Sequence, residues 1–200
     1  MLGQAPQTQE RKDAARNRAK ILDAARGLLD ERPIGEICMD ELARRAGVGK
    51  GTVYRRFADR ASLCRALLDE DAKQVQAHVL SGFGLPMNTA WATRAVELLN
   101  ALFDFTARNA SLLAEARAFE RGCPTRYDHP AHAWQRETLS LYLQRAVTAG
   151  EIPSLDPIIA AEHLLAGLEP DLIRWHRAQG RNADDLREHY RRLWLNAMGA

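Results

Sequence analysis

Cysteine is scarce in this chain: three residues among 200, far apart at Cys38, Cys64 and Cys123. An odd number at such spacing argues against a disulfide framework. No run of about 18 apolar residues occurs, so we expect no membrane-spanning helix. The first residues, M-L-G-Q-A-P-Q-T-Q-E-R-K, lack the apolar core of a signal peptide. These absences together predict a cytoplasmic protein with no membrane partner.

Catalytic and metal-binding signatures are missing as well. The sequence contains no G-x-S-x-G, H-E-x-x-H or P-loop pattern, and His163 has no nucleophile or phosphate-binding loop beside it. Metal-capable groups do gather at Cys123, Asp128, His129 and His132. A proline separates the two histidines, however, and no second Cys/His pair follows at a recognised spacing. We therefore expect an exposed loop here, no enzyme, no metal and no other cofactor.

Strictly alternating strand patterns are absent too, whereas helical periodicity recurs along most of the chain. The sequence thus predicts an all-α fold of about nine helices. We expect one helical domain over residues 1–60, with a mobile tail at 1–12, and a second helical domain over 61–200. The helices are predicted near residues 14–31, 39–57 (two short ones), 60–80, 88–109, 110–121, 131–149, from 156 with a kink or split at Pro170, and 183–198. Asp59 and Asp156 are expected to cap the helices that follow them.

The stretch from Met39 to Phe57 is the most informative. Its apolar residues follow helical spacing on both sides of Gly47, where a tight turn would need a left-handed backbone that glycine adopts at little cost. The second helix of the pair then exposes lysine, threonine, tyrosine and arginine, which bind phosphate or base edges. This pattern is typical of a DNA-binding helix-turn-helix.

The distribution of charged residues along the chain also favours DNA binding by this segment. Residues 1–60 hold thirteen Lys/Arg and nine Asp/Glu, whereas the remaining residues hold fifteen and seventeen. The basic excess therefore lies in the segment that carries the helix-turn-helix, as a nucleic-acid contact surface requires.

The segment A-R-R-A-G-V-G-K-G-T-V-Y-R-R-F-A-D-R-A-S-L, with one amphipathic helix before it and about six after it, resembles the TetR family of bacterial transcriptional regulators. Close similarity covers roughly residues 14–68, and the remainder matches only in the number and order of helices. The resemblance implies a ligand-responsive regulator, a repressor that binds a near-palindromic operator as a homodimer and leaves it when a small effector binds. In the bacterial cytoplasm such a protein would associate with the nucleoid when bound to DNA.

The resemblance also assigns roles to residues. Lys50 and Gly51 would lie at the start of the recognition helix against the major groove, the hydroxyls of Thr52 and Tyr54 would bind phosphate, and Arg60 would hold the DNA backbone. Cys38 stands where the family usually has a capping threonine or serine, which leaves that contact in doubt. The seven residues expected to bind DNA are Lys50, Gly51, Thr52, Tyr54, Arg55, Arg56 and Arg60.

Dimers of this family pair through their last two long helices. Two apolar rows suit such an interface here, although the same rows could pack on their own domain core. The rows are Leu164, Leu168, Leu172 and Trp175, and Leu186, Tyr190, Leu193 and Trp194.

An effector pocket is expected inside the second domain, and its aromatic and leucine content favours an apolar or aromatic ligand. The alternative is an architectural or interaction protein with the same DNA-binding head and no small ligand. A closed cavity would favour the sensor, and a solid core the alternative. The candidate lining residues, each of which could also be plain core, are Trp91, Phe103, Phe119, Trp134 and Tyr142.

Overall fold

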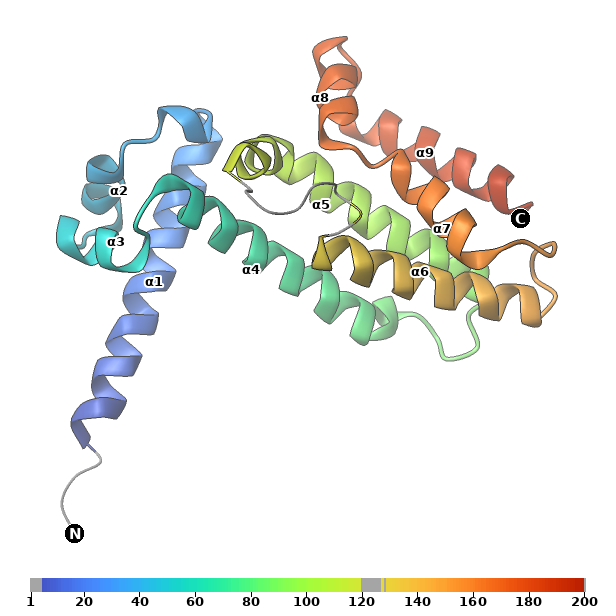
Figure 1. Ribbon diagram of the computed structural model, residues 1–200, viewed down its shortest axis with the longest axis horizontal. Helices are drawn as coiled ribbons and strands as arrows, with labels where there is room; N and C mark the ends of the chain where they lie inside the picture. The colour runs from blue at the N-terminus through green and yellow to red at the C-terminus, as the bar shows by residue number, and fades with distance from the viewer. Residues whose placement is uncertain (1–4, 120–126, 128, 200) are drawn as a thin grey trace. The chain divides into compact units, whose positions relative to one another are not determined.

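The computed structural model describes residues 5–119, 127 and 129–199, without the side chains of residues 5–10, 118 and 119. Every regular element in these residues is helical, and none is a strand, so the predicted all-α fold is confirmed (Figure 1). They form nine α-helices and two 3₁₀ turns. No helix in this part of the chain has both the length and the apolar character needed to cross a membrane.

The chain divides into two compact units, and the division runs through the middle of α4 (Arg60–Leu80), between Asp69 and Glu70. The first unit contains the residues up to Asp69 together with Glu115–Phe119, and the second contains the rest. The domain division predicted at residues 60 and 61 lies at the start of the same helix and stays a prediction.

The first unit is built from α1 (Ala5–Glu31), α2 (Met39–Ala46), α3 (Lys50–Arg56) and the start of α4. Apolar residues of each helix recur on one face, and burying those faces against one another stabilises the bundle. A hydrogen bond of 3.3 Å from Arg26 to the carbonyl of Leu67 also joins α1 to α4. The core of this unit consists of Ile21, Leu22, Ala25, Leu28, Leu42, Val53, Phe57, Leu63 and Leu67.

Helix α1 is longer than the sequence pattern indicated. It begins at Ala5, not at residue 14, so the mobile tail predicted for residues 1–12 is wrong from Ala5 onward. The physical reason is composition: Gln, Glu, Arg, Lys and Ala favour helix without an apolar stripe, and Pro6 is tolerated in the first turn. Residues 1–4 lie outside the described residues.

Helix α5 (Trp91–Phe119) is also longer than predicted, because the break expected between residues 109 and 110 does not occur. No proline or glycine interrupts this stretch. The side-chain amide of Asn109, the last residue before the expected break, donates a 3.0 Å hydrogen bond to the carbonyl of Phe105, one turn earlier in the same helix. Asn109 is buried, and its side-chain amide has a hydrogen-bond partner within the helix. The helix therefore continues past this residue.

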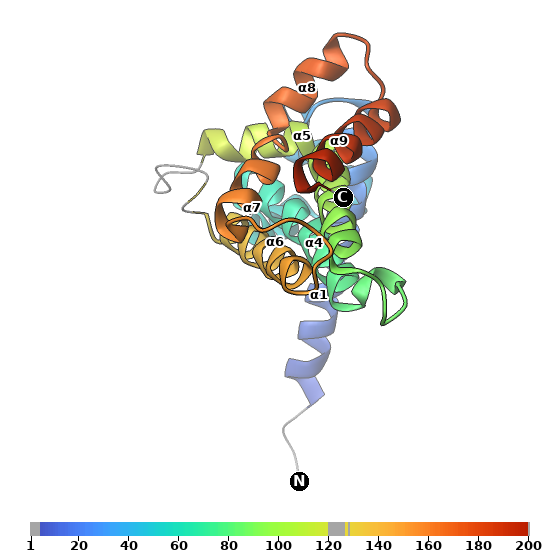
Figure 2. The same ribbon diagram turned by 90° about the vertical axis from the view of Figure 1, so that its right-hand side faces the viewer.

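The second unit packs α5 with α6 (Pro130–Thr148), α7 (Pro157–Ala166), α8 (Pro170–Ala178) and α9 (Ala183–Met198) around one apolar core. Helices α6 and α7 lie along each other in both views (Figure 1 and Figure 2). The predicted cap at Asp156 is confirmed: its Oδ1 accepts hydrogen bonds from the amides of Ile158 (2.9 Å) and Ile159 (3.0 Å). Pro170 splits the helix rather than kinking it, because α7 ends at Ala166 and α8 starts at the proline.

Candidate nucleic-acid interface

Helices α2 and α3 form the motif that the sequence predicts, with Gly47 between them. Gly47 adopts φ 64° and ψ 36°, the left-handed conformation expected for a turn glycine. Its backbone N–H donates hydrogen bonds to the carbonyls of Ala43 and Arg44. Ala43 and Val53 are buried within the unit, and the small side chain of Ala43 allows close packing. The predicted pair of helices around a left-handed glycine is confirmed.

The outward face of α3 is polar and positively charged. Lys50, Tyr54, Arg55 and Arg56 are exposed, whereas Val53 is buried and anchors the helix to the core. Tyr54 leaves 48% of its surface exposed, which is unusual for an aromatic residue and keeps its hydroxyl available. Thr52 is half-buried, and its hydroxyl oxygen lies 3.5 Å from a guanidinium nitrogen of Arg55. One short helix thus presents three cations and two hydroxyl groups on a rigid support.

Lys50 already has an anionic partner within the chain. Its Nζ lies 2.5 Å from Oδ2 of Asp40, in the first turn of α2. The hydrogen bond to Asp40 raises the pKa of the Lys50 ammonium, and the negative charge of the same carboxylate adds to that effect. The ammonium is therefore firmly charged and held beside the start of α3.

Arg60 is engaged inside the first unit. Its Nη1 donates a 2.6 Å hydrogen bond to the carbonyl of Gly35 and lies 3.7 Å from a carboxylate oxygen of Glu115. Its predicted contact with the DNA backbone stays a prediction, and that contact would compete with these two partners.

The starts of the three helices differ in how they are capped. Cys38 and Gly49 precede α2 and α3 without any side-chain hydrogen bond. Asp59, by contrast, precedes α4, and its Oδ1 accepts a 2.7 Å hydrogen bond from the amide of Ser62, as the sequence predicts. The Ser62 hydroxyl lies 3.3 Å from the amide of Asp59, which completes a reciprocal cap. The amide and hydroxyl of Ser62 lower the pKa of the Asp59 carboxyl.

The aromatic residues predicted to line an effector pocket instead pack within the second unit. The ring centroids of Trp91 and Tyr142 lie 5.9 Å apart, and those of Phe103 and Tyr190 lie 5.4 Å apart. Phe103 is fully buried. Trp134 is half-buried against the same core. The side chain of Phe119 lies outside the described residues. The described members of this set therefore contribute to the core of the second unit, and their contact with an effector stays a prediction.

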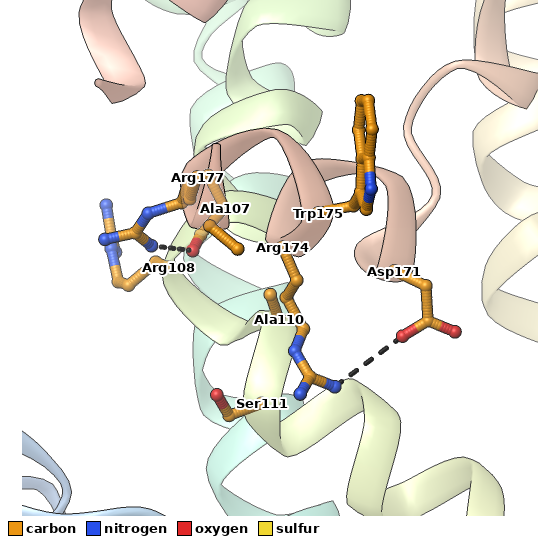
Figure 3. Close-up of a pocket in the computed structure, with 9 residues that line it drawn as sticks. Ala107, Arg108, Ala110, Ser111, Asp171, Arg174, Trp175 and Arg177 are labelled. Carbon is orange, nitrogen blue, oxygen red and sulfur yellow. Dashed lines mark hydrogen bonds and ion pairs between the residues drawn. The ribbon is translucent and has the colours of Figure 1, made fainter. Parts of the chain in front are cut away.

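Two of the hollows in the second unit are open to solvent, and neither of these is lined by those aromatic residues. The larger, of about 700 Å³, lies between α5 and α8 (Figure 3). The smaller, of about 300 Å³, lies among α4, α5 and α9. Sequence reasoning missed the arginines of the larger hollow: Arg174 and Arg177 stand three residues apart on one helix face, a usable signal, but their proximity to Arg108 follows only from the packing of α8 on α5.

Comparison with known proteins agrees with the geometry of α2 and α3. Residues 21–67, which span the helix-turn-helix, match the family described as "Bacterial regulatory proteins, tetR family". An HTH-type transcriptional regulator of Staphylococcus aureus is 41% identical over 61 residues, which are 30% of this chain and 33% of that protein. The chain thus spans about a third of the length of the curated relatives it matches.

Residues 21–67 are thus similar to the DNA-binding segment of the TetR family. Solved structures extend the likeness in fold beyond the DNA-binding segment. A TetR/AcrR-family regulator from Thermobifida fusca superposes with a TM-score of 0.72 at 22% identity, covering 90% of this chain and 96% of that one. FadR from Bacillus subtilis, solved in complex with stearoyl-CoA, gives 0.63 at 18% identity, covering 90% and 98%.

The eight apolar residues predicted for a TetR-family dimer interface fall into two groups. Five pack in the core of the second unit itself, as the alternative interpretation of these rows holds. The other three, Leu172, Trp175 and Leu193, leave 39%, 55% and 49% of their surface exposed on α8 and α9. Only these three are free to meet a second copy. The five core residues are Leu164, Leu168, Leu186, Tyr190 and Trp194.

Among the described residues, no group of three or more potential metal ligands comes together. Cys123 and Asp128 lie outside the described residues. His129 caps α6, its Nδ1 accepting a 3.1 Å hydrogen bond from the amide of Ala131. His132 is buried, with Nε2 2.8 Å from a carboxylate oxygen of Glu162. Both described histidines thus have structural partners.

Proposed function

We propose that this chain is a transcriptional regulator, most simply a repressor, that binds a near-palindromic DNA operator as a homodimer. The observation that carries the proposal is the exposed face of α3, with its three cations and two hydroxyls anchored by a buried valine. Such a helix fits the major groove of B-DNA, which is wide enough to admit it. The protein would act in the bacterial cytoplasm, on the nucleoid.

Within this proposal the residues divide by what they touch. Tyr54 and Thr52 bind phosphate through their hydroxyls, which positions the helix without reading sequence. Lys50 and Gly51, at the start of α3, approach base edges. Arg55 and Arg56 follow on the same exposed helix, and an arginine fork matches the two acceptors of guanine.

A small effector controls DNA binding in this proposal. One support is that a protein of similar fold was solved with stearoyl-CoA bound. The other is the way in which α4 and α5 connect the two units. Helix α4 continues from the first unit into the second, and α5 ends in the first unit, where Glu115 lies near Arg60. An effector can shift DNA affinity only if it binds two conformations differently, and DNA must then weaken effector binding by the same factor.

Selection of binding sites from random DNA with the purified full-length chain tests the proposed function. We expect enrichment of a near-palindromic motif whose half-sites lie about one helical turn apart. Failure to enrich any motif, at salt concentrations where the protein still binds DNA, would leave only non-specific binding and contradict the proposal.

One observation favours a second candidate, an architectural or interaction protein without a small ligand. Both described hollows are open to solvent, and the aromatic residues of the second unit are packed against its core. Operator affinity, measured with and without a bound small molecule, distinguishes the regulator from the architectural protein. A regulator with an effector must bind some small molecule that changes its operator affinity, and an architectural protein has an operator affinity that no bound small molecule changes.

A further inference from the structure

The larger hollow of the second unit is a groove between α5 and α8 (Figure 3). Its floor on α5 is made by Ala107 and Ala110, both buried and small enough to leave room above the helix. Its volume of about 700 Å³ falls in the range of sites that hold small organic molecules. The lining residues are Ala107, Arg108, Ala110, Ser111, Asp171, Arg174, Trp175, Arg177 and Ala178.

Positive charge predominates in this groove, with three guanidinium groups and one carboxylate. Arg174 lies 3.6 Å from the carboxylate of Asp171. Arg177 donates a 3.3 Å hydrogen bond to the neutral carbonyl of Ala107, and Arg108 has no hydrogen bond or ion pair among the described residues. Two guanidiniums therefore face the groove with their charge uncompensated.

The smaller hollow does not supply the missing anion. Arg108 also borders that hollow, whose carboxylates belong to Asp71, Glu97 and Asp104, but none of these forms an ion pair with Arg108 among the described residues. Asp104 already holds the guanidinium of Arg187 at 2.7 Å. The charge of Arg108 thus remains available on the side of the larger groove.

The arginines define two places in the groove (Figure 3). The guanidiniums of Arg108 and Arg177 lie together at one end, beside Ala107, whereas that of Arg174 points toward Ser111 at the other end. The indole of Trp175 points away from both. Arginine forks match the paired oxygens of phosphate and carboxylate, so each place suits one anionic group.

We propose that this groove binds a small organic molecule that carries two or more anionic groups, either phosphates or carboxylates. If the proposed regulator function holds, this molecule is the effector. That role rests on the proposed function, whereas the binding itself does not. The proposal replaces the apolar or aromatic effector expected from composition, because the aromatic residues lie in the core and the larger of the two hollows is cationic. Binding of the anion itself does not depend on DNA.

Isothermal titration calorimetry of the full chain with inorganic pyrophosphate and with citrate tests the proposal. Binding of pyrophosphate alone identifies a phosphate ligand, binding of citrate alone a carboxylate ligand, and binding of both supports the shared chemistry. Arg108→Gln should weaken the binding about tenfold or more, since a charge-assisted contact is lost. Arg192→Gln, which removes an equal charge from an exposed position on α9, should leave it unchanged.

A variant with the opposite sign protects the test against misfolding. Asp171→Asn removes the one carboxylate of the groove and should tighten anion binding several-fold, a gain that a damaged fold cannot produce. Absence of binding for both anions, or equal weakening by Arg108→Gln and Arg192→Gln, would overturn the proposal. Because these titrations contain no DNA, a chain that fails to select an operator can still bind the anion, so the two proposals fail separately.

Discussion

The ammonium of Lys50 lies 2.5 Å from the carboxylate of Asp40, so the first side chain of α3 is tied to the first turn of α2. Both side chains remain exposed, at 65% and 44%. Such an exposed pair is weak in water, so a DNA phosphate or base could displace the carboxylate from Lys50. The proposed contact of Lys50 with DNA would therefore compete with Asp40.

Replacing Asp40 by asparagine should increase affinity for random DNA about fivefold at low salt, because one negative charge leaves the binding face and Lys50 is released. Fluorescence anisotropy with labelled duplexes measures this change, and the gain should shrink as salt is added. The matched control is Asp30→Asn, which removes an exposed carboxylate on α1. Unchanged or lower affinity for Asp40→Asn would show that the pair does not restrain Lys50.

The turn between α2 and α3 depends on glycine at Gly47. An added Cβ there meets no atom within 4 Å, so the cost of Gly47→Ala comes only from the left-handed backbone and should be about 1–2 kcal/mol of unfolding free energy. Gly51→Ala provides the contrast, because that site is equally open but helical, and alanine should stabilise it by about 0.5–1 kcal/mol. Urea denaturation distinguishes the two, and equal effects would refute the assigned role of Gly47.

The cap at Asp59 predicts a specific acid sensitivity. Its folded-state pKa is lowered, so the cap stabilises the fold above the unfolded-state pKa of about 4 and loses this contribution as pH falls through the folded value. Asp59→Asn keeps a capping oxygen but removes the titration. We expect its unfolding free energy to fall less steeply than that of the wild type below about pH 4. Identical pH profiles for the two proteins would rule out this contribution.

The exposed apolar residues of α8 and α9 predict how the proposed dimer forms. Leu193→Glu should shift the protein toward monomer and weaken operator binding, since burying a charge at an apolar contact is costly. Leu141→Glu, at a similarly exposed position on α6, is the control and should leave the dimer intact. Sedimentation velocity reports the assembly state. A wild-type chain that stays monomeric at all concentrations would contradict the interface.

The elements that sequence reasoning located well are those with strong local signals. Gly47 in the turn, the capping carboxylates of Asp59 and Asp156, and the bounds of α9 follow from side chains acting on their own backbone. The break expected after Asn109 does not occur, and the side-chain amide of Asn109 bonds the carbonyl of Phe105 one turn earlier in the same long helix.

Features that depend on packing between helices could not be predicted in this way. An apolar row shows that a helix face is covered, not what covers it, so Tyr190 and Trp194 looked like interface residues although they pack in their own core. The cationic groove was missed for the same reason. Arg108 stands more than sixty positions before Arg174 in the sequence, and only the packing of α8 against α5 brings both to one hollow.

The central claim is that the exposed face of α3 recognises the base sequence of DNA. The ratio of the affinity for operator DNA to the affinity for random DNA tests this claim most directly. Fluorescence anisotropy on the selected operator and a scrambled duplex should show that Lys50→Ala narrows this ratio about tenfold, because a base contact is lost. Tyr54→Phe should weaken both complexes alike and leave the ratio unchanged, because its hydroxyl binds phosphate. If Lys50→Ala and Tyr54→Phe both leave each affinity at the wild-type value, α3 is not the DNA-binding surface and the account is wrong.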